Sequence, residues 1–137
     1  MIPQDKIYQT AQYLDLIDVA LCYMLFDVCN EKLIEATTMS NFINWMNMKP
    51  TMPEIKMRPR EKTRCCYMLK TVMEHILIKE FKNQWLDTML ASLGISRSFC
   101  DKHSYEVACD THVDRNEDLV EDLKDAFKKA EQLKKMK

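Results

Sequence analysis

Apolar residues recur at steps of three and four along most of this chain, which is the period of an amphipathic helix. The first such segment spans residues 5–29, where no glycine or proline intervenes, and its second half is apolar on nearly all sides. A helix of that kind is buried on several faces. A second uninterrupted segment spans 60–93 and is followed by Gly94, which favours helix termination. The pattern therefore predicts two long central helices, over about 5–29 and 60–93.

Shorter helical segments lie between and after these two. Residues 30–48 predict a helix that is interrupted near 37–40, where Ser40 is suited to cap a short second piece. A second serine, Ser96, is suited to cap another short helix. The last segment, 114–135, is acidic in its first half and rich in lysine at its end. That order favours a helix, because it complements the helix dipole.

The last segment also carries an apolar seam. Its members are spaced four, three, four and three residues apart: Leu119, Leu123, Ala126, Ala130 and Leu133. The two alanines permit close approach of another helix. Because two heptads are short for a coiled coil, the seam predicts packing against the chain's own domain. Pairing with a second copy, which would make an oligomer through the C-terminal helix, is the alternative.

Glycine and proline mark the places where helices cannot continue. The chain has one glycine, Gly94, and four prolines, three of which fall within 49–59. Those three predict the main connection between helices. A β-rich fold needs tight turns that usually require glycine, so the sequence predicts an all-α fold. We expect a single domain over residues 1–137, built as a bundle of about five helices.

Composition and charge narrow the class of protein further. The 137 residues are 47% hydrophobic and 30% charged, which is a globular balance, and the formal net charge is −1. A net charge so close to zero gives no overall field for binding nucleic acid or a membrane surface, so such a role needs a local patch. The sequence carries no catalytic motif of the common kinds: no glycine-rich phosphate loop, no nucleophile elbow and no HExxH zinc motif.

The cellular compartment of the protein is predicted from its apolar runs and its cysteines. The N-terminus has no basic region followed by an apolar core, so it does not resemble a signal peptide. The longest apolar run, 16–29, is interrupted by Asp18 and Asp27 and is shorter than the roughly 18 residues that a membrane-spanning helix requires. Six cysteines without an export signal indicate free thiols in a reducing compartment. We expect a cytoplasmic protein with no membrane contact.

The stretch CDKHSYEVACDTH, residues 100–112, is the one arrangement that suggests metal chemistry. Zinc prefers four nitrogen or sulfur ligands in a tetrahedron, and this stretch offers Cys100, His103, Cys109 and His112. On a continuous helix Cys100 and Cys109 would project from opposite faces, so a shared zinc ion requires the chain to curl. The alternative is that the cysteines fill small apolar spaces and that no cofactor is bound.

Two adjacent cysteines, Cys65 and Cys66, lie near the predicted start of the second long helix. A helix N-terminus with Arg60, Lys62 and Arg64 nearby lowers the pKa of a thiol, which makes one of the two a candidate reactive cysteine. The alternative is again that both serve packing.

Two further groups are candidate binding patches. A basic cluster suited to phosphate consists of Lys56, Arg58, Arg60, Lys62 and Arg64. A methionine-rich group with one tryptophan is suited to a protein partner, because flexible thioethers adapt to different surfaces. Its members are Met39, Trp45, Met46, Met48 and Met52. The alternatives are a solvated charged face for the first group and core packing for the second.

In MLASLGISRSFCDKH, residues 89–103, the letters LGISRS resemble the turn of the helix-turn-helix in bacterial DNA-binding regulators. The resemblance implies two helices joined at Gly94 and a role in DNA binding. That motif has a small residue four positions before the glycine and an apolar residue nine after it, where this chain has Leu90 and His103.

The sequence as a whole favours a non-enzymatic interaction or regulatory module that presents a helical surface to a protein partner. A nucleic-acid-binding regulator that uses residues 56–64 is the alternative. A small zinc-stabilised or thiol-reactive protein is a third interpretation.

Overall fold

Helices make up most of the molecule, and the predicted all-α class is confirmed. The computed structural model describes residues 4–50, 53–109 and 114–136; it is 67% helical and has no strand in those ranges. No helix within them combines the length and the apolar character needed to cross a bilayer. The helices are more numerous and shorter than expected: α1 (Gln4–Ala11), α2 (Val19–Cys29), α3 (Met39–Met46), α4 (Lys62–Met73), the 3-10 helix η1 (Lys79–Phe81), α5 (Lys82–Ser92), α6 (Arg97–His103), α7 (Glu106–Cys109) and α8 (Asp114–Lys135).

The first predicted long helix is interrupted at residues 12–18, between α1 and α2. The buried side-chain amide of Asn47 replaces the helical hydrogen bonds there. Its Oδ1 accepts from the backbone N–H of Leu16 at 2.7 Å and of Ile17 at 2.9 Å. Because the acceptor comes from the far end of α3, no local signal in 12–18 predicts this break.

The second predicted long helix is interrupted at residues 74–78, between α4 and η1. The backbone N–H of Leu77 donates to the carbonyl of Leu16 at 2.8 Å, so the two breaks are bonded to each other. The prediction of two long central helices is therefore wrong. Contacts between distant segments satisfy backbone groups that continuous helices would otherwise have satisfied.

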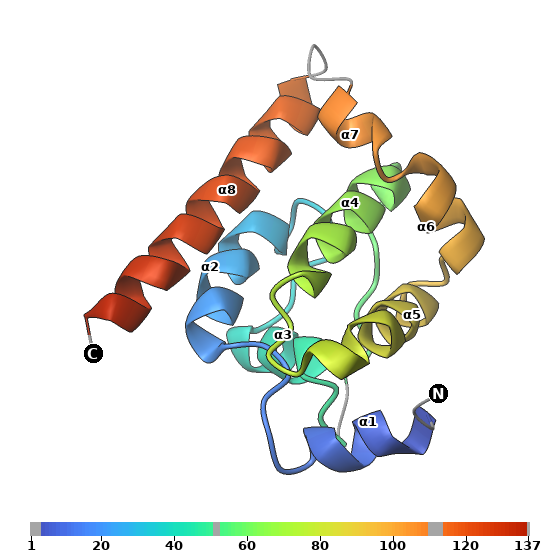
Figure 1. Cartoon of the computed structure of the whole chain (residues 1–137). Helices are drawn as coiled ribbons and strands as arrows, with labels where there is room; N and C mark the ends of the chain where they lie inside the picture. The colour runs from blue at the N-terminus through green and yellow to red at the C-terminus, as the bar shows by residue number, and fades with distance from the viewer. Residues whose placement is uncertain (1–3, 51–52, 110–113, 137) are drawn as a thin grey trace.

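Figure 1 shows α2 and α8 lying antiparallel along one side of the molecule, with α4 in the centre. Helices α5 and α6 lie on the other side of α4, α7 lies between the start of α8 and α6, and α1 and α3 lie at one end (Figure 1). Four members of the α8 seam are buried: Leu119, Leu123, Ala126 and Ala130. The seam therefore packs within the chain, and an oligomer through α8 would have to use its exposed, charged face.

A single hydrophobic core draws side chains from every helix in Figure 1. Both tryptophans lie at its centre, fully buried, and each places its polar N–H against an acceptor. Trp45 Nε1 donates to Ser92 Oγ at 2.9 Å, and Trp85 Nε1 donates to the carbonyl of Met46 at 2.7 Å. These bonds tie α3 to α5 and leave the indole N–H groups satisfied.

The described part of the proline-rich connection, 49–50 and 53–59, is not helical. It runs beside the segment that follows α2, where Arg58 N–H donates to the carbonyl of Leu33 at 3.0 Å. The turns at its ends and after α2 use left-handed residues: φ is 63° at Glu31, 52° at Met48 and 69° at Arg60. Residues other than glycine adopt this conformation at a cost of about 1 kcal/mol or more. The chain therefore makes three turns without the glycine that such turns favour.

Capping serines and threonines set the starts of two short helices. Ser96 Oγ accepts from the backbone N–H of Phe99 at 3.1 Å, so α6 begins where the sequence predicts. Helix α3 begins slightly earlier than predicted. Its cap is Thr38, whose Oγ1 accepts from Asn41 N–H at 3.1 Å, and Ser40 lies inside the helix.

Candidate functional site

Several large apolar side chains are exposed in and near the two breaks. Among the described residues they are Tyr8, Tyr13, Leu14, Val19, Tyr23, Leu77, Tyr105, Leu133 and Met136. All except Tyr105 belong to α1, α2, the breaks or the end of α8. On the breaks themselves, Tyr13 is 82% exposed, Leu14 55% and Leu77 51%. A single exposed leucine needs no explanation, but several in adjoining segments are typical of a binding surface.

Two contacts show that these segments adjoin. The Leu77–Leu16 backbone hydrogen bond joins the break at 74–78 to the break at 12–18. In Figure 1 the break at 12–18 is the blue loop between α1 and α2. At the start of α2, the carboxylate of Asp18 lies 3.8 Å from Lys134 Nζ, near the end of α8. The apolar side chains around these two contacts form what we name the break surface: Tyr13, Leu14, Val19, Leu77 and Leu133.

No local pattern in the sequence marks the break surface. Leu14 and Leu77 fit the three-and-four spacing of the predicted long helices, which assigns both to the core. The helices end before they reach these positions, so both side chains reach the surface instead.

A small cavity of about 30 Å³ adjoins the break surface, between the start of α2 and the end of α8. The imidazole of His75 stacks on the ring of Phe127 there, with centroids 4.0 Å apart and an angle of 15° between planes. Burial lowers the pKa of His75, and the nearby carboxylates of Glu131 and Glu74 oppose that shift. The Oδ2 of Asp18 is buried without a hydrogen bond from the described residues, and Lys134 is its charge partner.

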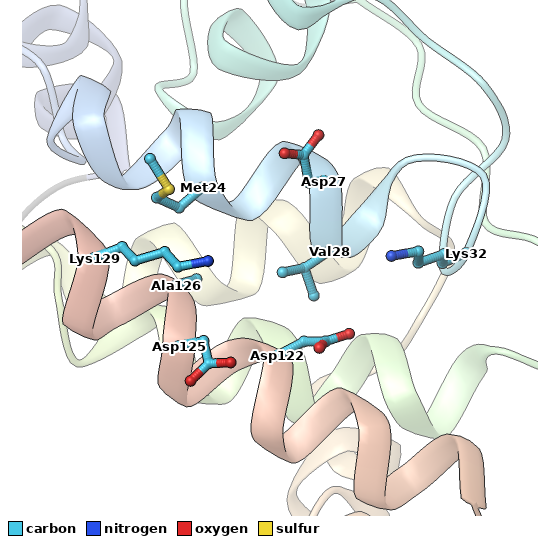
Figure 2. A pocket seen from close by; sticks show the side chains of 8 residues that line it. All are labelled: Met24, Asp27, Val28, Lys32, Asp122, Asp125, Ala126 and Lys129. Carbon is cyan, nitrogen blue, oxygen red and sulfur yellow. The ribbon is translucent and has the colours of Figure 1, made fainter.

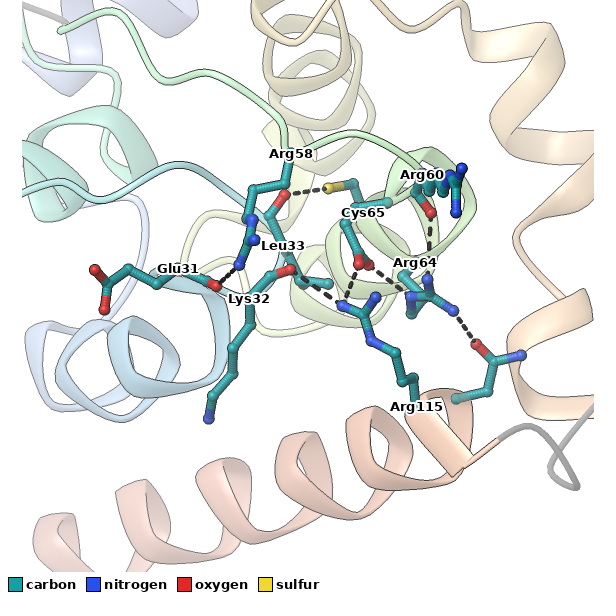
Figure 3. A network of polar contacts seen from close by, with 10 residues as sticks. Glu31, Lys32, Leu33, Arg58, Arg60, Arg64, Cys65 and Arg115 are labelled. Carbon is teal, nitrogen blue, oxygen red and sulfur yellow. Dashed lines mark hydrogen bonds and ion pairs between the residues drawn. The ribbon is translucent and has the colours of Figure 1, made fainter.

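The five predicted basic residues do not form one free cationic face. Figure 3 shows Arg58 reaching back to the segment after α2, where its Nη1 donates to the carbonyl of Glu31. The guanidinium of Arg64 is held at three points. Its Nε lies 2.6 Å from Glu61 Oε2, and its Nη1 lies 2.9 Å from Asn116 Oδ1. Its Nη2 donates to the carbonyl of Arg60 at 3.2 Å. Two of the five side chains are therefore engaged in contacts within the chain.

The carboxylate of Glu61 is the centre of this network. It is 2% exposed and pairs with both Arg64 and Arg115. Arg115 Nη2 also donates to the carbonyl of Lys32 at 3.4 Å. A buried carboxylate needs such partners, because an unpaired one costs several kcal/mol. The network ties the start of α4 to the start of α8 and serves the fold.

The other three basic side chains are less constrained. Lys62 Nζ lies 4.0 Å from the centre of the Phe99 ring, a cation–π contact. Lys56 and Arg60 are exposed, and neither side chain has a hydrogen bond or ion pair to the described residues. Nucleic-acid binding through this patch stays a prediction. Of its five basic side chains, two make no contact with the described residues and are available to phosphate.

A surface cavity of about 240 Å³ lies beside the basic residues, at the start of α4. Arg60, Thr63 and Arg64 line one part of it, and Glu106 places a carboxylate among them. That carboxylate also bonds to His103 Nδ1 at 3.0 Å. Since Arg64 is already paired and Glu106 adds negative charge, the cavity does not single out an anionic ligand.

A groove of about 170 Å³ lies between α2 and α8, and Figure 2 shows the side chains that line it. Apolar side chains from both helices contribute to it, and charged groups of both signs surround them. The lining residues are Met24, Asp27, Val28, Lys32, Asp122, Asp125, Ala126 and Lys129. Because three carboxylates and two ammonium groups share this small opening, its charge selects no class of ligand.

Three of the four predicted zinc ligands lie in described segments. Cys100 is buried against α4, whereas Cys109 is exposed at the end of α7. The His103 ring bonds to the carboxylate of Glu106, and His112 lies outside the described residues. Across 4–50, 53–109 and 114–136, no three His, Cys, Asp or Glu side chains are grouped as a metal site requires. Zinc binding stays a prediction.

The candidate reactive thiols lie in the core. Burial raises the pKa of Cys65 to about 12. The pKa of Cys66 is also raised, by its interaction with the Cys100 thiol and by burial. The same interaction lowers the pKa of Cys100. The lowering expected for Cys65 and Cys66 at a helix start is therefore outweighed by loss of contact with water.

The methionine-rich group lies mostly inside the molecule. Trp45, Met46 and Met48 are buried and Met39 is half-buried, while Met52 lies outside the described residues. The alternative interpretation, that these side chains fill an irregular core, accounts for the three buried members.

The stretch that resembles a helix-turn-helix does join two helices. Gly94 has a φ of 74° and follows α5, as the sequence predicts for a glycine that ends a helix. At the start of α6, Arg97 pairs with Asp87 at 2.9 Å and with Asp101 at 3.0 Å. Two carboxylates beside this arginine disfavour contact with phosphate, so the turn adds no support for DNA binding.

Comparison of the chain with protein-family models, with curated proteins and with solved structures finds no match.

Proposed function

We propose that this chain is a non-enzymatic helical module that binds a protein partner through the break surface. The observation that carries the proposal is the exposure of Tyr13, Leu14 and Leu77 in two breaks that are bonded to each other. Burying one large apolar side chain contributes about 1.5–3 kcal/mol. Three such side chains therefore supply a substantial part of the roughly 8 kcal/mol that micromolar binding requires.

Charged side chains flank the break surface. Lys49 Nζ lies 3.3 Å from Asp15 beside the first break, and Lys134 pairs with Asp18 beside the end of α8. An apolar centre with a polar rim is the usual anatomy of a protein–protein interface.

The buried polar residues also favour a non-enzymatic function. Among the described residues they are Asn47, Glu61, Ser104 and Asn116. The side chain of Asn47 accepts a hydrogen bond from the backbone of the first break. The carboxylate of Glu61 forms ion pairs with two arginines, and the Asn116 side chain accepts a hydrogen bond from Arg64. Asn47, Glu61 and Asn116 thus hold segments of the fold together.

A capture experiment tests the proposal. Tagged protein is used to retain partners from an extract of the cells that make it, with and without nuclease. The same is done with a triple variant, Tyr13→Ser, Leu14→Ser and Leu77→Ser, and with the matched control Tyr105→Ser. Tyr105 is 62% exposed but lies away from the breaks, in the turn between α6 and α7.

We expect one or more proteins to be retained by the wild type and by Tyr105→Ser, with or without nuclease, and to be lost from the triple variant. Circular dichroism and melting temperature show whether the triple variant is folded. Equal retention by the triple variant would overturn the proposal. Loss of all retained proteins upon nuclease treatment would favour the nucleic-acid alternative.

A further inference from the structure

One side of α8 carries charged and apolar groups in a fixed order along the helix. These residues are spaced three and four positions apart, so they share one side of the helix, and all of them are exposed. We name them the α8 stripe: Asp118, Asp122, Asp125, Lys129, Leu133 and Met136. Three carboxylates come first, one ammonium group follows, and two apolar side chains lie at the end.

Contacts within the chain do not account for the charges of the stripe. None of its charged members has an ion pair with the described residues, because the ion pairs of α8 all use other side chains. The helix dipole does not account for them either, since its effect falls off within the first and last turns. Asp122 and Lys129 each lie more than one turn inside α8 (Asp114–Lys135).

The stripe borders the groove between α2 and α8, to which both helices contribute apolar side chains. Figure 2 shows Asp122, Asp125 and Lys129 beside the first part of this groove, of about 170 Å³. A second part of about 340 Å³ shares lining residues with the first and extends toward the start of α8, where Leu33 and Leu119 line it. The wider part of the groove therefore lies at the acidic end of the stripe, and the exposed apolar side chains lie at the other end.

We propose that two copies of this chain associate through the α8 stripe, with their α8 helices antiparallel about a two-fold axis. In that arrangement the acidic half of each stripe faces the lysine and the apolar end of the other copy. Leu133, which is 38% exposed, and Met136, which is 81% exposed, then cover the wider part of the groove in the other copy. A surface with both signs of charge in one order is complementary to the same surface in the reverse direction, and a second copy supplies that surface.

The single lysine of the stripe fixes how the two helices align. Asp122 and Lys129 are about two turns apart on α8, which is too far for them to pair within one chain. In a two-fold pair centred between them, Asp122 of each copy meets Lys129 of the other, so the same contact forms twice. This alignment places Leu133 opposite Asp118, beside the Leu119 side chain that lines the wider part of the groove.

The expected dimer is reversible. Exposed ion pairs contribute little affinity by themselves, so the apolar side chains supply most of the affinity and the charges set the direction of pairing. Each copy offers only Leu133 and Met136 as exposed apolar side chains of the stripe, which is fewer than an obligate dimer uses. We therefore expect a dissociation constant of about 10–100 µM.

Sedimentation velocity of the full chain, at concentrations from about 1 µM to about 1 mM, measures the dimer directly. Asp122→Lys and Lys129→Asp each put like charges at both contacts and should weaken dimerisation at least about tenfold. An equal mixture of these two variants should dimerise like the wild type, because each contact again joins a lysine to an aspartate. Both positions are exposed, and circular dichroism verifies that each variant is folded.

Two controls separate this dimer from other effects. Lys102→Asp makes the same change of charge at an exposed lysine of α6, on the other side of α4, and should dimerise like the wild type (Figure 1). The triple variant of the break surface, Tyr13→Ser, Leu14→Ser and Leu77→Ser, should also dimerise like the wild type. The dimer and the proposed function are therefore tested independently.

Three results would overturn the inference. The first is a wild-type chain that stays monomeric up to about 1 mM, which would leave the proposed function intact. The second is dimerisation of Asp122→Lys and Lys129→Asp as strong as that of the wild type, or a mixture of the two that stays monomeric. The third is loss of the dimer in the triple variant, which would place the contact on the break surface instead.

Discussion

Replacing Asn47 by alanine tests the interruption of the first predicted long helix. The native amide accepts hydrogen bonds from the backbone N–H groups of Leu16 and Ile17 in a fully buried position. Its Nδ2 also donates to the carbonyl of Ile43 at 3.3 Å and to the sulfur of Cys22 at 3.8 Å. Alanine removes all four contacts and leaves two buried N–H groups without an acceptor.

The expected cost follows from those two groups. A buried donor that loses its partner costs about 1–3 kcal/mol, so the substitution should lower the free energy of unfolding by about 2–6 kcal/mol. Small domains have a total stability of about 5–15 kcal/mol, so the loss is a large fraction of the whole. For a chain of 137 residues, a central loss of about 3 kcal/mol lowers the melting temperature by about 10 °C.

Urea and thermal unfolding, followed by circular dichroism, measure this loss against a matched control. Asn41→Ala changes an exposed asparagine of the same helix, α3, and should stay within about 0.5 kcal/mol of the wild type. Hydrogen exchange adds a local readout, because the amides of Leu16 and Ile17 should exchange faster in Asn47→Ala. If Asn47→Ala is as stable as Asn41→Ala, the amide does not hold the break, and a continuous helix over 5–29 regains its support.

Two further predictions concern charge. In titrations with duplex DNA, the logarithm of any binding constant should fall as the logarithm of salt concentration rises, with a slope no steeper than about −2. The reason is that, of the five predicted basic residues, only Lys56 and Arg60 make no side-chain contact with the described residues. A slope near about −4.5 would show that all five reach phosphate. Because the pKa of His75 is lowered in the folded chain, the His75 imidazole binds a proton more tightly in the unfolded chain. The free energy of unfolding should therefore fall as the pH drops from about 6.5 through the pKa of His75 in the folded chain. Urea unfolding at pH 7 and pH 5 should show a smaller fall for His75→Gln than for the wild type, and an equal fall would remove His75 as a cause.

The features that the sequence predicts correctly are local ones. Gly94 ends α5 because a left-handed glycine closes a helix wherever it occurs. Ser96 caps α6 because its hydroxyl reaches an N–H only three residues ahead. Four of the five residues of the α8 seam are buried because the spacing of the seam fixes one apolar face. In each case the cause lies within a few residues of its effect.

The breaks and the network around Glu61 depend on contacts between distant segments. Nothing near Leu16 indicates that Asn47 will accept its N–H, and nothing near Arg64 indicates that Asn116 will bind its guanidinium from 52 residues away. Both cases follow from the same rule, that a buried polar group takes whatever partner the fold brings to it. Sequence spacing therefore identifies the residues of the basic patch but not how many of their charges remain free.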